Sequence, residues 1–347
     1  MNLPRITIIV PSYNQGRYLE ETLQSVISQS YPDLELFVID GGSTDNSVSV
    51  IKKHENHIQW WVSEKDRGQS DALNKGLKRA TGEIVNWLGS DDLLTPGTLQ
   101  QVAEIFRSQA DDVGLIHGGT TLFMDHKIIR DDWGASDHCA ERYFAGIAFS
   151  QPSAFFLRKY FDVAGSQLTE SLHYGMDYDL YSRLACVCRF MAVKNIFSKY
   201  RLHERSKSIA EEHRFSDDWS RTFINLCKNL QWDDLLSELK VPGVVDENLL
   251  SFYYPFSFRA NDAIIDSLQK KKILFYHFCI LLRSYYHTGN RHKARILAHY
   301  LKMKYPQDWL AAEKYIPEIF LRLKVPETLL GLMLGMKKVY KKMFSGK

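Results

Sequence analysis

Two adjacent carboxylates, Asp91 and Asp92, stand where an apolar run of strand length, residues 84–88, comes to an end. A Pro-Gly pair, Pro96-Gly97, then opens a helical pattern. Two acids fixed at a strand end can hold a hard divalent cation, which in turn can hold the phosphates of a nucleotide. The same aspartates could instead cap the following helix, and the pair alone does not decide between these functions.

Polar residues follow other apolar runs in the same way. The loops after the first three predicted strands contain Asn14, Asp40 and Asp66. Facing carboxylates repel one another unless a cation or a donor-rich ligand lies between them. Together with Asp91 and Asp92, this repetition of polar residues at strand ends favours a binding site over loops that are merely exposed to solvent.

Predicted strands and helices alternate in the part of the chain that positions these residues. Strand patterns at residues 6–10, 34–39, 59–62 and 84–88 are separated by helical patterns through about the first hundred residues. Such alternation predicts an α/β fold with parallel strands and right-handed crossovers. Ligands of such sheets bind outside the carboxyl ends of the strands, where the polar residues fall.

A second carboxylate stands at the start of a later helical pattern. Leu180, Leu184 and Val187 share one predicted helix face, which puts Asp177 at or near the amino end. There its carboxylate faces the positive end of the helix dipole. By itself, Asp177 could be only an N-cap.

Four segments together resemble the family 2 glycosyltransferases, which bind nucleotide sugars with the GT-A fold. They are residues 7–14 (TIIVPSYN), 40–45 (DGGSTD), 66–76 (DRGQSDALNKG) and 90–92 (SDD). The four occur in the order and at spacings plausible for that family. The resemblance is strong to about residue 105 and looser to about residue 210. It implies a Rossmann-like mixed sheet flanked by helices.

The resemblance implies a place for the nucleoside of the donor. Pro11, Tyr13 and Asn14 would wall the base and ribose. Asp40 would accept a hydrogen bond from the ring N–H of the base, and Asp91 one from a ribose hydroxyl.

The same resemblance places the diphosphate and a metal. Asp66 and Arg67 would lie beside the base and diphosphate, and Arg67 is the better phosphate partner because its charge is permanent. The family's metal motif is often D-x-D, but its first position here is Ser90. Asp92 is therefore the main expected ligand of Mg²⁺ or Mn²⁺, while Gln151 could face the donor sugar.

Catalysis is assigned by the resemblance to the helix after residue 175. In the family, a carboxylate there deprotonates the acceptor hydroxyl, and attack opposite the leaving diphosphate inverts the anomeric carbon. Asp177 is the expected base. Asp179, expected to turn sideways on the same helix, is the alternative.

Residues 200–208 resemble the loop that closes over the diphosphate in this family. His203 would complete the metal shell, and Arg201 or Lys207 would contact phosphate. Between the Asp91–Asp92 pair and the predicted helix of Asp177, strands are expected at residues 113–117, 120–123 and 154–157, with a return strand around residues 128–129.

Helical patterns replace the alternation beyond about residue 212. A helix is expected over residues 215–230, a break at 241–243 and further helices from residue 247. Residues 278–304 resemble one tetratricopeptide-type helical pair, which must pack on neighbouring helices because it cannot bury its own face.

The predicted organisation is therefore a catalytic domain (1–212), a helical domain (213–327) and a tail (328–347). Lysines in the tail alternate with apolar residues, and such a basic amphipathic helix could lie on an anionic membrane surface, at about 1 kcal/mol per cation. Packing on the helical domain, or dimerisation, are the alternatives.

Composition narrows the classes of protein. The chain has 347 residues, 45% of them hydrophobic, and its net charge of +3 is too small to argue for a nucleic-acid partner. Five cysteines without metal or disulfide spacing suit a reduced cytosol. We expect no signal peptide, and the apolar run 273–282 is much shorter than the roughly 20 residues that cross a bilayer. The expected location is the cytoplasm, with the inner face of the membrane as the surface that the tail would contact.

The predicted function is an inverting, metal-dependent glycosyltransferase that uses a nucleotide diphosphate sugar, first of all a UDP-sugar. The acceptor would be a growing cell-surface or lipid-linked glycan. One alternative is a non-catalytic nucleotide-sugar-binding or scaffold protein, which the presence of Asp92 and Asp177 disfavours. The other is a sugar nucleotidyltransferase, but these enzymes carry a Gly-rich loop after the first strand, where residues 11–17 are glycine-poor.

Overall fold

The computed structural model describes residues 3–125, 127–134, 139–204, 206 and 211–325. Its strands are β1 (Ile6–Ser12), β2 (Leu34–Asp40), β3 (Trp60–Ser63), β4 (Ile84–Trp87), β5 (Leu93–Leu94), β6 (Val113–Met124), β7 (Lys127–Asp132), β8 (Ala154–Leu157) and β9 (Arg189–Arg201). They form one sheet in the order β3-β2-β1-β4-β8-β6-β9-β5, and β7 pairs with β6 outside this path.

Helices fall into two groups along the chain. The first group is α1 (Gly16–Ile27), α2 (Ser47–Lys53), α3 (Gln69–Arg79), α4 (Thr98–Ser108), α5 (Glu141–Ala145), α6 (Arg158–Val163) and α7 (Met176–Ala185), with short 3-10 helices η1 (Glu55–His57) and η2 (Gln151–Ser153). The second group is α9 (Glu212–Asn229), α10 (Asp233–Lys240), α11 (Asp262–Asp266), α12 (Lys270–His287), α13 (Arg291–Lys304), α14 (Gln307–Ala312) and α15 (Ile316–Leu323), with η3 (Glu247–Ser251).

Parallel pairing aligns the strand ends that matter for the site. β1 pairs in parallel with β2 and β4, and β2 pairs in parallel with β3. The register sets Ser12 opposite Asp40, and Asp40 opposite Ser63. The loops that follow these strands therefore leave the sheet at one edge.

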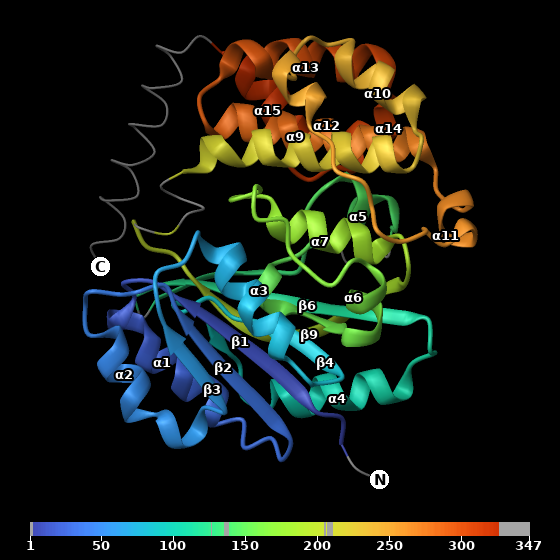
Figure 1. Ribbon diagram of the computed structural model, residues 1–347. Helices are drawn as coiled ribbons and strands as arrows, with labels where there is room; N and C mark the ends of the chain where they lie inside the picture. The colour runs from blue at the N-terminus through green and yellow to red at the C-terminus, as the bar shows by residue number, and fades with distance from the viewer. Residues whose placement is uncertain (1–2, 126, 135–138, 205, 207–210, 326–347) are drawn as a thin grey trace.

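Each face of the sheet is covered by helices (Figure 1). Alternate residues of β1 point to opposite faces: Ile8 packs in a core with α1, α2 and α4, and Ile9 packs in a core with α3. The second core continues through α5 and α7 into α9, α12 and α13. The helices of the second group form a further layer above this face (Figure 1).

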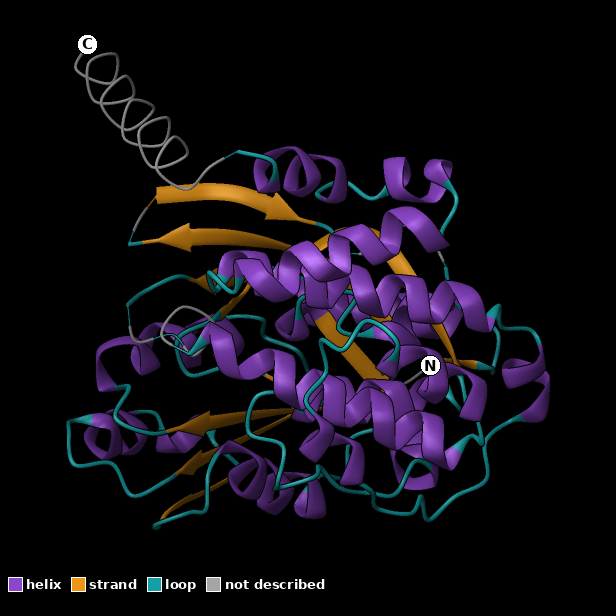
Figure 2. Cartoon of the chain, turned by 90° about the horizontal axis from the view of Figure 1, so that it is seen from above, coloured by secondary structure: helices purple, strands orange, loops and turns teal. Residues whose placement is uncertain are grey.

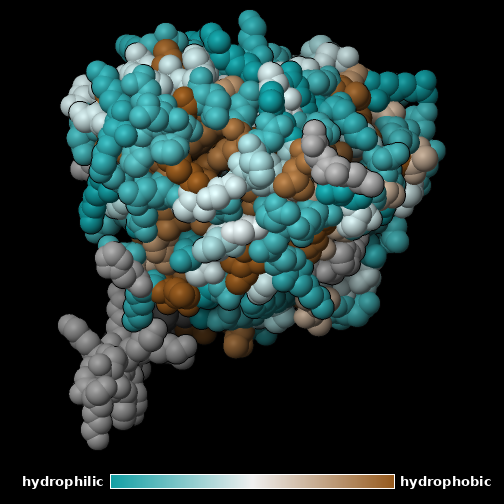
Figure 3. Space-filling view, turned by 90° about the horizontal axis from the view of Figure 1, so that it is seen from below, coloured by the Kyte–Doolittle hydropathy of each residue, from teal (hydrophilic) through white to brown (hydrophobic). Residues whose placement is uncertain are grey.

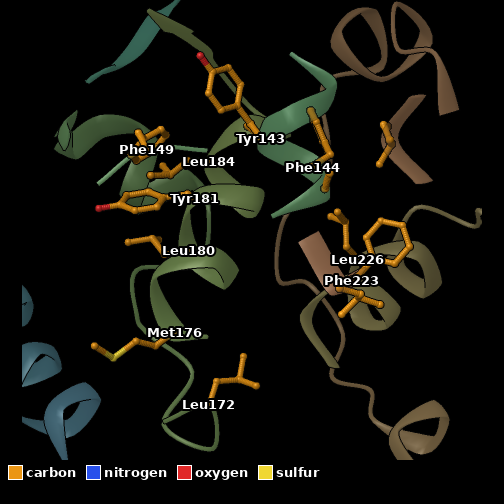
Figure 4. Packing of buried hydrophobic residues seen from close by; sticks show 14 of the residues in the cluster. Tyr143, Phe144, Phe149, Leu172, Met176, Leu180, Tyr181, Leu184, Phe223 and Leu226 are labelled. Carbon is orange, nitrogen blue, oxygen red and sulfur yellow. The ribbon is translucent and has the colours of Figure 1, made fainter. Parts of the chain in front are cut away.

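The contact between the two groups of helices is apolar and continuous. Leu180 and Leu184 of α7 lie on the side of Phe149, while Phe144 of α5 lies toward Phe223 of α9 (Figure 4). Phe223 is fully buried and stacks on a histidine of α12 with ring centroids 3.9 Å apart. The sheet-bearing and helical parts thus share one hydrophobic core.

The molecular surface seen from below is mostly polar. Apolar side chains appear there in separate recesses between polar ones (Figure 3). Among the described residues, no helix combines the length and the apolar character that crossing a bilayer requires. The predicted tail, residues 328–347, lies outside the described residues.

The predicted α/β fold class is confirmed, as are the strands at the ends of which the polar residues were expected. Residues 113–117 and 120–123 are strand residues as expected, but their division into two strands was wrong, because the single strand β6 runs through both. Gly118 and Gly119 do not break it: a Cβ at Gly118 would lie 2.4 Å from the Asn195 carbonyl oxygen, so the glycine permits close approach of β9.

Two further expectations needed correction. The 13-residue strand β9 was not predicted, and Tyr200 and Arg201 end this strand instead of belonging to the following loop. Helical structure after the break at 241–243 resumes as the short η3, and the next α-helix starts only at Asp262. The helical pair expected over 278–304 is formed by α12 and α13, which pack on the helices around them.

The shared core generates a prediction about stability. Phe223→Ala should lower the free energy of unfolding by about 3–5 kcal/mol, because it removes a fully buried ring and leaves a cavity. Urea unfolding followed by circular dichroism should show one transition, moved to lower denaturant for the whole protein. Val241→Ala, at a side chain that is 66% exposed, is the control and should change stability by no more than about 0.5 kcal/mol. Separate transitions for the helical and sheet-bearing parts would contradict a shared core.

Candidate active site

The loop after β2 is built around the fully buried carboxylate of Asp40. Its Oδ2 accepts from the backbone N–H groups of Gly42 and Ser43, at 3.2 and 2.9 Å, and from the hydroxyl of Ser63. Its Oδ1 accepts from the Ser43 hydroxyl. Asp40, the predicted partner of the nucleotide base, thus accepts hydrogen bonds on both carboxylate oxygens from residues of its own loop.

The loop after β1 lies against the same segment. Asn14 has a positive φ of 52° and accepts from the Thr44 N–H at 2.9 Å, while its own N–H donates to Ser43. Tyr13, by contrast, is 62% exposed, and Pro11 is buried within β1. Of the three residues expected to wall the base, only Tyr13 presents most of its side chain to solvent.

The loop after β3 joins this edge through Asp66. Its Oδ1 accepts from the Gly68 N–H at 2.9 Å, and its Oδ2 would lie 2.5 Å from a Cβ at Gly41. A side chain at Gly41 would therefore displace the carboxylate. Arg67 is 73% exposed and lies 2.9 Å from both Asp71 and Glu170.

The acid pair after β4 is held by strand β9 and the loop that follows it. Asp92 is 5% exposed and its Oδ1 accepts from the Arg201 N–H at 2.9 Å. Asp91 Oδ2 lies 2.8 Å from Nε2 of His203. Burial, and then the charge of Asp91, raise the pKa of Asp92 well above its ordinary value.

Gly89 leaves the space into which the two carboxylates turn. A Cβ there would lie 3.0 Å from both Oδ1 of Asp91 and Oδ2 of Asp92. The acid pair therefore presents one oxygen from each residue to the same point. Among the residues expected as ligands, Asp92 and His203 both lie next to Asp91.

These donors are of the right chemistry for a divalent cation. Carboxylate oxygens suit Mg²⁺ and Mn²⁺, and a diphosphate commonly supplies further ligands. Within the described ranges, no group of three or more His, Cys, Asp or Glu side chains is arranged to hold a metal. The two acids, with His203 beside them, have the chemistry to bind such a cation, and its remaining ligands would have to come from a bound ligand or water.

Arg201 is a structural part of this arrangement. Its side chain is 6% exposed and its Nε donates to the Asp91 carbonyl oxygen at 2.9 Å. The guanidinium pairs with Glu21 and lies over the rings of Tyr18 and Phe123. Lys207, the other cation expected at phosphate, lies outside the described residues.

Two buried aromatic rings join the end of β4 to helix α7. Gln151 donates to the Trp87 carbonyl oxygen at 2.7 Å, and the Trp87 ring stacks on Tyr181 at 5.8 Å. Burial, and then the charge of Asp177, raise the pKa of Tyr181 well above its ordinary value. The end of β4 and helix α7 are thereby brought together.

Asp177 and Asp179 occupy different environments on α7. Asp177 is half-buried in the first turn, where its Oδ1 accepts from the Tyr178 N–H at 2.8 Å. Asp179 is 1% exposed and pairs with Arg183 at 3.0 Å, and it also accepts from the hydroxyls of Thr169 and Tyr254. The contacts of Asp179 are those of a structural ion pair, whereas Asp177 stands at the helix end.

The amino ends of helices α3 and α7 are in contact. The Ser70 hydroxyl lies 2.8 Å from the sulfur of Met176, the first residue of α7. This contact joins the start of α7, which carries Asp177, to the segment that follows Asp66 and Arg67.

Sequence reasoning missed Tyr18, Glu21 and Tyr181. Tyr18 and Glu21 are three residues apart on α1, one helical turn, which is a signal that they share a face. Tyr181 lies four residues after Asp177 and so belongs on the same side of its helix. No local pattern indicates that Arg201 would be the residue that pairs with Glu21 of α1.

Known proteins resemble the chain in both sequence and structure. Residues 7–130 match the family model described as Glycosyl transferase family 2. An uncharacterised glycosyltransferase of Nostoc is 37% identical over 116 residues, which cover 33% of this chain and 36% of the relative. Chondroitin synthase of Escherichia coli is 24% identical over 258 residues, or 68% of this chain and 37% of the relative. The chain thus matches little more than a third of the length of these relatives.

Two solved structures share the fold. The mannosyltransferase PcManGT of Pyrobaculum calidifontis, in complex with GDP-Man and Mn²⁺, aligns with a TM-score of 0.56 and 20% identity, over 99% of this chain and 84% of its own. S. aureus TarS, in complex with UDP-GlcNAc, aligns with a TM-score of 0.56 and 15% identity, over 87% and 93%. Residues 7–130 therefore match the family 2 glycosyltransferases, and the chain has the GT-A fold.

Proposed function

We propose that the protein transfers a sugar from a nucleotide diphosphate sugar to a hydroxyl group of a saccharide or lipid-linked saccharide, with inversion at the anomeric carbon. The observation that carries this proposal is the convergence of Asp91 and Asp92 on the space at Gly89, along the sheet edge that Asp40 and Asp66 also occupy. The complexes of TarS with UDP-GlcNAc and of PcManGT with GDP-Man support a nucleotide sugar donor. We infer a UDP-sugar first and a GDP-sugar second.

Asp92 and His203 would hold Mn²⁺ or Mg²⁺ against the donor diphosphate. We propose Asp91, expected from the sequence to contact the ribose, as a further ligand, because it lies beside both. Bound there, the cation supplies positive charge that offsets the charge of the leaving nucleoside diphosphate. Arg201 orients the two acids, because its backbone N–H binds Asp92 and its guanidinium binds the Asp91 carbonyl oxygen. Tyr13, Arg67 and Gln151 are the proposed contacts to the base, the diphosphate and the sugar.

Asp177 is the proposed general base. Its carboxylate accepts the proton of the acceptor hydroxyl while that oxygen bonds to the anomeric carbon. The bond from the anomeric carbon to the diphosphate oxygen breaks on the opposite side, and its electron pair leaves with the nucleoside diphosphate. Asp179 is not free for this task, since Arg183 and Tyr254 already bind its two oxygens.

Replacing the proposed general base, Asp177, tests the mechanism. Asp177→Asn keeps the size of the side chain but cannot accept the proton, so turnover should fall by about 10²–10⁴-fold. Donor affinity, measured by calorimetric titration, should stay within about twofold. Asp162→Asn, at an exposed carboxylate of α6, is the matched control and should leave both quantities unchanged. Unchanged turnover in the Asp177 variant would remove this residue from the mechanism.

Donor binding tests the nucleotide and metal assignment. Titration with UDP, GDP and dTDP, each with Mn²⁺ and then with a chelator, should show binding of one nucleotide that depends on the metal. Asp92→Asn should weaken that binding by about tenfold or more, because it removes a carboxylate ligand. Binding that is as tight in chelator would contradict the metal site, and binding without turnover on a wide panel of acceptors would favour a scaffold protein.

The same titration should depend on pH through Asp92. Its pKa is raised in the folded protein, so the proton competes with the cation at a higher pH than at an ordinary aspartate. Mn²⁺-dependent affinity should therefore fall as the pH is lowered from about 8 toward about 5. An affinity that does not change over this interval would place the metal elsewhere.

We also propose that the protein works in the cytoplasm as a peripheral protein at the inner face of the membrane, because residues 328–347 combine lysines with apolar residues. Anionic liposomes should carry the intact protein upward in a flotation gradient and leave behind a variant that ends at residue 327. Equal flotation of both proteins, or of neither, would contradict this location.

A further inference from the structure

A pocket of about 620 Å³ lies between the sheet-bearing part and the helices of the second group. Its walls come from β7, from the segment before η2, from α12 and from the turn between α14 and α15. Figure 2 shows the β6–β7 hairpin beside the last C-terminal helices. The volume is within the range of ligand sites, roughly 300–1,000 Å³.

The pocket adjoins the candidate active site through a wall of two rings. Phe149 lines the pocket and packs on Tyr181 with ring centroids 5.0 Å apart. Tyr181 in turn stacks on Trp87 and lies one helical turn after Asp177. A ligand in the pocket would therefore lie behind the wall of the site, away from the strand ends that receive the donor.

Aromatic rings line this pocket. Trp133, Tyr276 and Tyr315 all belong to its walls, and Trp133 is 40% exposed. The position of Trp133 depends on Gly119, where a Cβ would lie 2.7 Å from the indole ring. Flat, partly exposed rings with polar edges are surfaces on which the C–H faces of sugar rings pack.

Cations gather around one of these rings. The Arg283 guanidinium and the Lys314 ammonium lie 4.8 and 5.4 Å from the centre of the Tyr315 ring. Arg130 donates to the Tyr315 hydroxyl at 3.2 Å. Burial raises the pKa of Tyr315, but this hydrogen bond and the three positive charges outweigh burial and leave its pKa below the ordinary value.

The positive charge at Tyr315 is only partly offset by acids. Asp131 and Asp132 also line the pocket, and Arg130 is paired with Asp132 at 3.7 Å. Arg142, across the pocket, is paired with Glu313 at 2.6 Å. Over the part of the chain that the structure describes, no carboxylate forms an ion pair with Arg283 or Lys314. Among the described residues, an anionic group at Arg283 and Lys314 would therefore displace no ion-pair partner.

We propose that the pocket binds an acidic sugar unit of the acceptor, remote from the hydroxyl that is glycosylated. The sugar ring would pack on Trp133, and its carboxylate or phosphate would bind Arg283 and Lys314 beside Tyr315. The acceptor is thus an anionic saccharide, held at one unit while another unit reaches Asp177. This inference rests on the proposed function.

Calorimetric titration with three hexasaccharides tests the proposal. An oligogalacturonate, a phosphodiester-linked sugar oligomer and the carboxyl-reduced, neutral form of the first are compared on the full chain. At least one acidic oligomer should bind about tenfold more tightly than the neutral one. The acidic oligomer that binds identifies a carboxylate or a phosphate as the recognised group.

Variants locate the binding. The double change Arg283→Gln and Lys314→Gln should weaken the acidic oligomer by about tenfold, and Trp133→Ala should weaken acidic and neutral oligomers alike. Lys302→Gln is the matched control, since this lysine lies over Phe320, outside the pocket, and should change nothing. Equal binding of acidic and neutral oligomers, no saccharide binding, or binding of inorganic phosphate as tight as that of the oligomers would overturn the proposal.

Nucleotide titration in the same proteins separates the two proposals. If UDP or GDP binds with Mn²⁺ but no acidic saccharide does, the pocket inference fails alone. If an acidic saccharide binds in a pocket-dependent way but no nucleotide does, the proposed transfer reaction fails and the saccharide site stands.

Discussion

The buried ion pair between Asp179 and Arg183 fixes the helix on which the proposed chemistry depends. Both side chains are almost fully buried, and removing two charges from water is costly unless every polar group is satisfied. Arg183 therefore also donates to the carbonyl oxygens of Ala164 and Gln167, and Asp179 accepts from Tyr254. These partners come from before and after α7 in the chain. The helix, and with it Asp177, can occupy its place only when both flanking segments have folded.

A similar dependence on distant segments governs the acid pair. The strand β4 delivers Asp91 and Asp92, but their orientation comes from β9, more than a hundred residues later. Arg201 is in turn anchored on Glu21 of α1. The site is therefore assembled from the beginning, the middle and the end of the sheet-bearing part, although its motifs occur as short local segments.

Local patterns predicted what local physics determines. The strands that end near Asp40, Asp66 and Asp91 are marked by apolar runs and polar loops, and these were predicted correctly. The strand β9 was missed because most of its residues are only half-buried, so its sequence lacks a continuous apolar run. The hydrogen bond from Ser63 of β3 to Asp40, and the burial of Arg201, depend on tertiary contacts that no spacing encodes. For the same reason the pocket at Tyr315 could not be predicted, since its walls come from four separate segments.

The contact of Tyr254 with Asp179 also bears on how such chains can diverge. Tyr254 lies in the irregular segment after η3, 75 residues after Asp179 in the chain. A relative with a different helical unit would lack this hydroxyl and would keep a buried acid with an unmet oxygen. Positions 179, 183 and 254 should therefore change together among related sequences, because the buried acid of the sheet-bearing part is satisfied by a hydroxyl from the helical part.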